Sequence, residues 1–533
     1  MNRRIVEIIV ISVLLLGIMI PFLGKPFHID DPFYIEITKA VVHDPLKPYS
    51  FMINTGDITS SGFADFSPPL FSYFLAPVWD KWGASEVPLH LVALLFAFSA
   101  VLSFYFLCSE IGLKPLIPTL VFLSVPFFAV GTNLMLDTPV LGLAIPSVLF
   151  FVAGVKREKL WPFIFSGVLF SLAVLTKYSA LAFFVPFFVY PFLSKKPRHI
   201  IPFAIGLAVF LLWNIYCFYV YGKPHFMNSC VIGKYSKYTL DHVIHNPLVF
   251  VMIIGMTLPY AVFIIRRGWP LYFSLMCGLG TCIGYFLDHQ GIESLVNSFL
   301  VGGGVFLGFY LLIYVSGYIE LKKKGRYFAI TNDHFFIFMA FWITMIIIMN
   351  MFFTPFIALR NIFFMYPALI IIMFKYTLFS KIAAKKMYIA IGCILMVHVA
   401  LAYADLRYAQ SYKNAAECLK KTYSDRTVWY FGGWGWQYYA DAAGFNQWSK
   451  LNARTKKGDI VIVPQNVGKP NMTDELKDKL KKVESLTYEL SWLPIRSHSA
   501  LSHAGFYCTA VLRPTYSLSF KPLEIIDIYE VVK

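Results

Sequence analysis

Thirteen apolar segments divide most of the chain, and they limit its fold more than any other feature. The segments are 5–23, 87–107, 115–132, 138–155, 161–176, 179–193, 200–221, 247–265, 270–287, 295–318, 334–353, 361–379 and 387–404. A helix needs about 20 apolar residues to cross a bilayer. The 533 residues are 58% hydrophobic and only 14% charged, whereas soluble domains are about 45–50% apolar and about 25% charged. The sequence therefore predicts a polytopic, all-α membrane protein of about 13 transmembrane helices.

The basic residues gather in short clusters between these segments. The clusters are Arg3/Arg4, Lys114, Lys156/Arg157/Lys159, Lys195/Lys196/Arg198, Arg266/Arg267, Lys322/Lys323/Lys324/Arg326 and Lys381/Lys385/Lys386. If every segment spans, they share one face, and positive residues mark the cytoplasmic side of membrane proteins. The net charge of +16 thus indicates membrane orientation, and we expect no nucleic-acid partner. The opposite face receives residues 30 and 31 and the C-terminal part of the chain.

Two domains are expected. Residues 1–405 form the transmembrane domain, in which 24–86 is a long first external loop with interfacial helices, one of them capped by Asp31 with Pro32 at its first position. Residues 406–533 have the composition of an extracytoplasmic α/β domain. We expect its strands at 428–431, 459–463, 486–490, 506–512 and 525–531, and its helices at 409–421 and 474–484, the latter capped by Thr473. No Walker or G-x-G-x-x-G motif supports a nucleotide site.

Five ionisable residues stand at external helix ends: Asp30, Asp31, Asp137, Lys177 and Arg360. One interpretation is structural: the acids would cap helices, and the cations would extend their side chains toward the lipid headgroups. However, Lys177 and Arg360 lie on the face that usually lacks cations. A carboxylate can take a proton from a hydroxyl, and Lys or Arg can hold a phosphate. These residues therefore predict a charged site at the external membrane surface.

A metal site has weaker support. The external and C-terminal histidines are His28, His242, His245, His289, His498 and His503. Their spacing matches no zinc motif. We assign no metal ligand and no certain cofactor, and a divalent metal stays open.

The order of several short motifs is that of a known family. These are Asp30-Asp31 with Tyr34, Pro68-Pro69-Leu70, Asp137, Gly167 with Leu175-Thr176-Lys177, and Arg360 with Pro367. Over residues 1–405 the chain resembles GT-C fold glycosyltransferases of family 39, which include protein O-mannosyltransferases and the lipid A aminoarabinose transferase. It departs from relatives at Asp31, where Glu is common, and at Ser67, where Lys or His is common.

The resemblance implies a sugar donor carried on a polyprenyl phosphate and transfer with inversion to a hydroxyl of a protein, lipid or glycan. It implies that Asp30 or Asp31 is the base, and that Lys177 and Arg360 hold the phosphate. Tyr34, Pro68 and Asp137 would complete the substrate-binding residues. The expected location is the bilayer of a bacterial inner membrane with the site outside. A transporter or flippase of a lipid-linked or small solute is the main alternative, and a glycan-binding scaffold is another.

Overall fold

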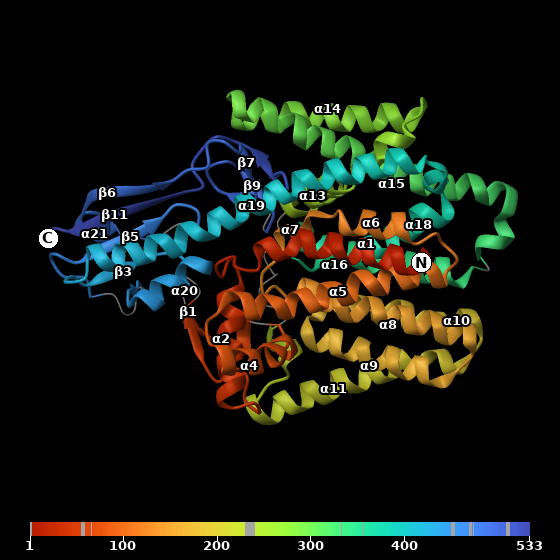
Figure 1. Ribbon diagram of the computed structural model, residues 1–533, viewed down its shortest axis with the longest axis horizontal. Helices are drawn as coiled ribbons and strands as arrows, with labels where there is room; N and C mark the ends of the chain where they lie inside the picture. The colour runs from red at the N-terminus through yellow and green to blue at the C-terminus, as the bar shows by residue number, and fades with distance from the viewer. Residues whose placement is uncertain are drawn as a thin grey trace.

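The computed structural model shows a bundle of helices with a small sheet-containing domain at one end, on the left in Figure 1. The described residues are 3–54, 59–65, 67–229, 240–331, 333–354, 356–448, 454–467, 472, 474–507 and 512–533. Most bundle helices run roughly along the long axis of the molecule, and the N-terminus lies toward the end away from the sheet (Figure 1). One apolar core is continuous from bundle residues such as Leu15 and Phe104 to sheet residues such as Tyr430 and Ile526.

Nine helical segments of the described part are long and apolar enough to cross a membrane. They are α1 (Arg3–Met19) with η1 (Ile20–Phe22), α5 (Glu86–Glu110), α8 (Asp137–Arg157), η3 (Pro197–Ile200) with α11 (Ile201–Tyr221), α14 (Trp269–His289), α15 (Ile292–Thr331), α16 (His334–Phe352), α17 (Leu359–Ile362) with η5 (Phe363–Met365) and α18 (Tyr366–Tyr376), and α19 (Ala384–Thr422). Shorter apolar helices are α9 (Leu160–Thr176), η2 (Tyr178–Phe183) with α10 (Phe184–Ser194), and α13 (Leu240–Thr257). The chain is an integral multi-pass membrane protein, as predicted. Short connecting helices are α12 (His225–Ser229), η4 (Pro259–Ile264) and η6 (Leu378–Lys381).

The predicted span 115–132 is wrong as one continuous helix. It forms α6 (Leu116–Leu123) and α7 (Pro126–Val130), separated by a break at Ser124 and Val125. Pro126 cannot donate a backbone hydrogen bond and disfavours helical backbone at the residue before it. Val125 accordingly has extended backbone, with φ −62° and ψ 133°. The loop that follows leads to the start of α8 at Asp137 and is buried.

The first external loop folds into α2 (Asp31–His43), β1 (Met52–Asn54), β2 (Thr59–Ser61), α3 (Gly62–Asp65) and α4 (Leu70–Trp82). β1 and β2 pair antiparallel. In α4, the Ser72 hydroxyl donates to the carbonyl of Tyr34 in α2, at 3.2 Å. The predicted cap of α2 is shifted by one residue: the N-cap position belongs to Asp30, whose side chain makes no capping hydrogen bond. Asp30 is therefore available for another partner.

The C-terminal part has the predicted α/β character. Its sheet has the order β4-β3-β5-β11-β6, formed by β3 (Val428–Tyr430), β4 (Asn446–Gln447), β5 (Ile460–Pro464), β6 (Leu480–Tyr488) and β11 (Glu524–Val531), with helices α20 (Trp434–Ala443) and α21 (Asp474–Lys477). β3 is parallel to β4 and β5, whereas β11 is antiparallel to β5 and β6. Two small ribbons pair β7 (Ile495–Arg496) with β10 (Ser517–Leu518) and β8 (His498–Ser499) with β9 (Ala504–Gly505).

One predicted element of this part is wrong, and another lies largely outside the described residues. The helix expected at 474–484 ends at Lys477, because the residues from Leu480 onward pair with β11 instead. The pairing of these residues with β11 therefore outweighs the helical preference of the local sequence. Of the strand expected at 506–512, residues 506, 507 and 512 are not in a strand, and 508–511 lie outside the described residues, as does Thr473.

Helix α19 connects the two parts without a break. It runs from the bundle into the small domain and continues to Thr422 (Figure 1). The domain boundary predicted at residue 405 stays a prediction, and it falls inside this helix. A continuous helix transmits position rigidly, so the C-terminal part is held in a fixed place relative to the external loop.

Candidate functional site

Asp30 and Arg360, 330 residues apart in sequence, form an ion pair. Arg360 Nη1 donates to Asp30 Oδ2 at 2.6 Å, and the two side chains are 16% and 21% exposed. Asp30 precedes α2, and Arg360 lies in α17 just before α18. The Nε of Arg360 is buried, and no described atom accepts a hydrogen bond from it. This guanidinium therefore has a donor left over for an anionic group.

Asp137 and Lys177 form a second pair. Lys177 Nζ lies 2.6 Å from Asp137 Oδ1, with Asp137 1% exposed and Lys177 21% exposed. Asp137 is the first residue of α8, where the helix dipole favours a carboxylate. Lys177 ends α9 in extended backbone, with φ −157° and ψ 134°. The lysine can therefore reach the surface while its charge remains compensated.

The two pairs belong to one site. The ammonium of Lys177 lies 5.7 Å from the ring centre of Phe364, which follows α17, and the charge of Asp137 acts on Arg360. Tyr34 faces the same charges from α2. Burial, and next the charge of Asp30, raise the pKa of Tyr34 well above its usual range. Its phenol therefore stays protonated and can donate a hydrogen bond. The structure brings together Asp30, Tyr34, Asp137, Lys177 and Arg360.

Asp31 takes part in neither of these two ion pairs. It is fully buried, and its carboxylate accepts backbone N–H bonds from His28 at 2.9 Å and from Leu134 at 2.8 Å. His90 Nε2 lies 3.9 Å from the same carboxylate. Through these two hydrogen bonds, the Asp31 carboxylate connects the loop before α2 with the loop before α8. Asp31 thus positions the segments that carry Asp30 and Asp137.

Pro68 is buried immediately before α4, where Tyr49 donates to the carbonyl of the neighbouring Ser67 at 2.7 Å. It shapes the start of the helix that packs on α2. Among the described residues, no group of three or more His, Cys, Asp or Glu side chains is arranged to hold a metal ion. The described carboxylates of the site have cations or backbone N–H groups as partners.

A buried charge pair behind the site was not predicted. Lys25 and Asp405 are 1% and 0% exposed, and Lys25 Nζ lies 3.1 Å from Asp405 Oδ2. Ser497 and Tyr507 of the C-terminal part donate to Asp405 at 2.6 and 2.7 Å. The signal in the sequence was Lys25 itself, a further cation on the face where cations are scarce. The pair joins the segment before Asp30 to α19 and to the C-terminal part.

A cavity of about 470 Å³ lies between α2, the helix that follows Asp30, and α20. Its lining includes Pro32 and Glu36 of α2, Asn54 of β1, and Gln437 and Asp441 of α20. Asn54 Oδ1 and Gln437 Oε1 are buried, and no described atom donates to either. Burial raises the pKa of Asp441 above its usual range. Such a lining suits a polyhydroxylated molecule, whose hydroxyls can donate to these acceptors.

Sequence comparison supports the expected resemblance. The family described as dolichyl-phosphate-mannose-protein mannosyltransferase matches residues 67–218. That range contains Pro68, Asp137 and Lys177. No curated protein sequence matches this chain.

Comparison with solved structures also returns matches, among them three with the following identity, coverage and TM-score. The structure of ArnT from Cupriavidus metallidurans bound to undecaprenyl phosphate has 12% identity and a TM-score of 0.43, covering 90% of this chain and 95% of ArnT. Its apo form has 11% identity and a TM-score of 0.43, covering 99% and 97%. The oligosaccharyltransferase AglB from Archaeoglobus fulgidus, in complex with an inhibitory peptide and a dolichol-phosphate, has 11% identity and a TM-score of 0.31, covering 69% of this chain and 55% of AglB.

Proposed function

We propose that this protein is a membrane glycosyltransferase that moves a sugar from a polyprenyl-phosphate donor to an acceptor hydroxyl. The observation that carries the proposal is the cluster in which an accessible carboxylate, Asp30, meets two cations, Arg360 and Lys177. The match of residues 67–218 to a mannosyltransferase family that uses a lipid-phosphate donor supports the same chemistry. The basic clusters of the sequence lie on the opposite face, so the site would face the outside of a bacterial inner membrane.

The donor phosphate would bind to the cations. Arg360 already donates to Asp30 through Nη1, and its buried Nε is free of any described partner. A phosphate oxygen that accepts from the remaining donors would share the guanidinium with Asp30. Lys177 would contribute a second charge from the end of α9. Charge that develops on the leaving phosphate is stabilised by such fixed cations.

Asp30 would act as the general base. Its carboxylate takes the proton of the acceptor hydroxyl, the hydroxyl oxygen forms a bond to the anomeric carbon, and the bond from that carbon to the phosphate oxygen breaks. The polyprenyl phosphate leaves with the electron pair, and a single displacement inverts the anomeric configuration. Tyr34, protonated, and Asp137 would hydrogen-bond the sugar. Asp31 would hold the loops in place without exchanging a proton with the acceptor.

The cavity between α2 and α20 would admit the acceptor. Its lining includes Pro32, two residues after Asp30, and the acceptors on Asn54 and Gln437, to which no described atom donates, suit hydroxyl donors. A protein, lipid or glycan acceptor would present its hydroxyl from this side, while the donor lipid stays in the bilayer.

The test separates binding from chemistry. Lipids that copurify with the full-length protein are identified by mass spectrometry, and the polyprenyl-linked sugar found is then used as donor. Asp30→Asn should retain donor binding and lose about 10²–10⁴-fold in transfer rate, the usual contribution of a general base. Arg360→Gln and Lys177→Gln should weaken donor binding, whereas Lys156→Gln, on the opposite face, should not. Full transfer by Asp30→Asn would refute its role as base, and absence of any polyprenyl lipid would refute the donor class.

A further inference from the structure

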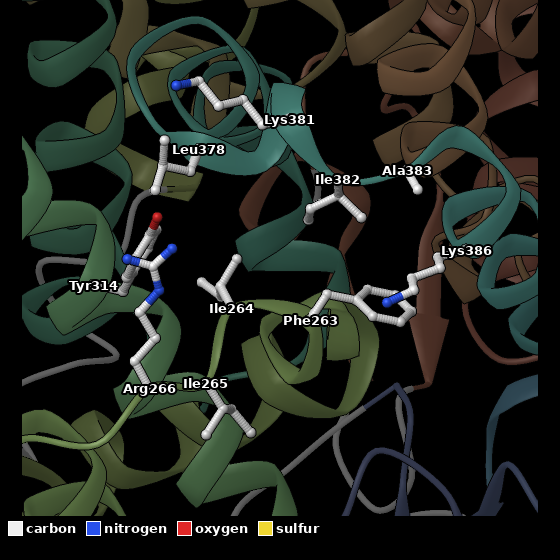
Figure 2. Close-up of a pocket in the computed structure, with 10 residues that line it drawn as sticks. All are labelled: Phe263, Ile264, Ile265, Arg266, Tyr314, Leu378, Lys381, Ile382, Ala383 and Lys386. Atoms are coloured by element: carbon white, nitrogen blue, oxygen red, sulfur yellow. The ribbon is translucent and has the colours of Figure 1, made fainter.

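A separate cavity lies at the end of the bundle away from the C-terminal part. It has a volume of about 310 Å³ and lies where η4, the loop before α14, α15, η6 and the start of α19 meet. Figure 2 shows its lining side chains, with Arg266 directed toward Tyr314 and with Lys381 on the opposite wall. We call it the basic cavity, because its charged lining residues are Arg266, Lys381 and Lys386.

Among the described residues, no acid compensates these cations. The lining contains no carboxylate, and within the described residues no ion pair joins Arg266, Lys381 or Lys386 to an acid. All three residues are solvent-exposed, and cations that line one hollow without an acid beside them make its potential positive. The cavity therefore favours an anionic ligand.

Another cavity of the same molecule provides the contrast. It has a volume of about 420 Å³ and is lined by Arg4, Lys156, Arg157 and Glu110. Here Glu110 lies 3.4 Å from Arg157 and 3.9 Å from Lys156. Glu110 therefore partly neutralises the cations of this cavity. Both cavities have a basic lining, so the basic lining alone does not distinguish them. What distinguishes the basic cavity is that its lining contains no carboxylate.

The surroundings of the basic cavity indicate an amphiphilic ligand. Phe263, Ile264, Leu378 and Ile382 form the apolar part of its lining. On the outer surface beside it, Val262 is 54% exposed and Ile389 is 58% exposed. Exposed apolar side chains on a membrane helix face acyl chains. A ligand with an anionic head and apolar tails would contact both the cations and this surface.

We propose that the basic cavity binds the phosphate headgroup of an anionic phospholipid from the leaflet on that side of the membrane. Arg266, Lys381 and Lys386 would surround the phosphate, with Arg266 able to donate two hydrogen bonds to it. The acyl chains would lie along Val262 and Ile389. Basic pockets between membrane helices recognise acidic headgroups in this way. The site is independent of the proposed transferase chemistry at the other end of the bundle.

The experiment is a binding titration of the full-length protein in neutral detergent. The probes are dioleoyl phosphatidylglycerol, dioleoyl phosphatidylcholine and inorganic phosphate, with bound lipid counted by native mass spectrometry. The test variant is Arg266→Gln/Lys381→Gln/Lys386→Gln. The matched control, Arg4→Gln/Lys156→Gln/Arg157→Gln, removes the same number of positive charges from the compensated cavity. Folding is checked by the melting temperature, and Lys381→Glu serves as a single charge reversal at an exposed side chain.

We expect phosphatidylglycerol to bind and phosphatidylcholine to bind much more weakly. The test variant should lose about 100-fold in affinity, because each cation near an anionic headgroup contributes about fivefold. The control variant should lose less than about fivefold, and Lys381→Glu should lose at least that factor. Equal losses in both triple variants would overturn the proposal, since they would indicate general charge attraction. Binding of inorganic phosphate with no preference for the lipid would overturn it as well, because the ligand would then be a free anion.

Discussion

Two adjacent aspartates of the same chemistry receive different environments at the start of α2. Asp30 is 21% exposed and contacts Arg360, whereas Asp31 is fully buried and accepts two backbone N–H bonds. The sequence places both at the external face but cannot distinguish them, because Arg360, the partner of Asp30, and Leu134, a partner of Asp31, are each more than 100 positions away. Only the folded chain shows which carboxylate an acceptor can approach.

The pair of Asp137 and Lys177 allows a prediction about coupling. Removing one partner leaves a mostly buried charge uncompensated, so Asp137→Asn and Lys177→Gln should each destabilise the protein, while the double variant should lose less than the sum. We expect a coupling free energy of about 1–3 kcal/mol, reduced from that of a fully buried pair because Lys177 reaches solvent. The measurement is a double-mutant cycle on the free energy of unfolding in mixed micelles titrated with denaturing detergent.

The control for this cycle is the more exposed pair of Glu110 and Lys156. Their side chains are 23% and 51% exposed, and Lys156 Nζ lies 3.9 Å from Glu110 Oε1. Surface pairs of this kind couple by about 0–1 kcal/mol. A coupling for Asp137 and Lys177 no larger than that of this control would contradict the assignment of a shielded pair.

At the scale of elements, α20 carries a close contact between the C-terminal part and the site. A Cβ atom added at Gly435 would collide with the backbone carbonyl of Phe27 and would lie 3.1 Å from Cα of His28. Nearby, Phe27 N donates to the Tyr439 hydroxyl at 2.8 Å. Because the obstructing atoms belong to the backbone, they cannot move aside without shifting the segment that leads to Asp30. Glycine at this position therefore fixes the distance between α20 and the site.

Gly435→Ala should lower both the melting temperature and the transfer rate. Overpacking of this kind typically costs about 1–3 kcal/mol. The matched control is Gly433→Ala, two residues earlier, where the nearest atom to an added Cβ is Gln437 Oε1 at 3.8 Å. Thermal unfolding and sugar transfer are measured for both variants. Equal behaviour of the two variants would show that the contact with Phe27 does not constrain the site.

Elements with strong local patterns could be predicted, and elements decided by pairing could not. Most of the long apolar runs form helices as predicted, 115–132 being broken at Ser124 and Val125, and β3, β5 and β11 lie within two residues of their predicted limits. The sequence predicts a helix through Leu480 because Leu476, Leu480 and Val483 recur at helical spacing among charged residues, whereas the strand depends on pairing with β11. The site residues were selected by charge on an unusual face, whereas Lys25 and Asp405 escaped because their partners come from three separate parts of the chain.

At the scale of the whole molecule, a buried acid joins the last long helix to the C-terminal sheet. Glu524 of β11 is fully buried and accepts hydrogen bonds from the Tyr412 hydroxyl of α19 at 2.5 Å and from the backbone N–H groups of Gln465, Asn466 and Ile525 at 3.0, 3.2 and 2.9 Å. Burial raises the pKa of Glu524 from 4.5 to about 7, although these hydrogen bonds oppose the shift. The junction between the two parts thus contains a group that titrates near neutral pH.

The folded protein should therefore lose stability as the pH rises toward and through 7. Between pH 4.5 and about 7 the folded state holds a proton on Glu524 that the unfolded chain has released, so the stabilisation is complete below pH 4.5 and is lost above about pH 7. The whole effect amounts to about 3 kcal/mol. Glu524→Gln keeps the acceptor oxygen and cannot titrate. Its melting temperature, measured by tryptophan fluorescence from pH 5 to pH 8, should fall less than that of the wild type.

The control is Glu530→Gln. Glu530 lies on the same strand but is partly exposed and pairs with Arg426 at 2.7 Å, so this variant should follow the wild-type curve. Parallel curves for the wild type and Glu524→Gln would show that this carboxyl is already ionised in the folded protein across that range.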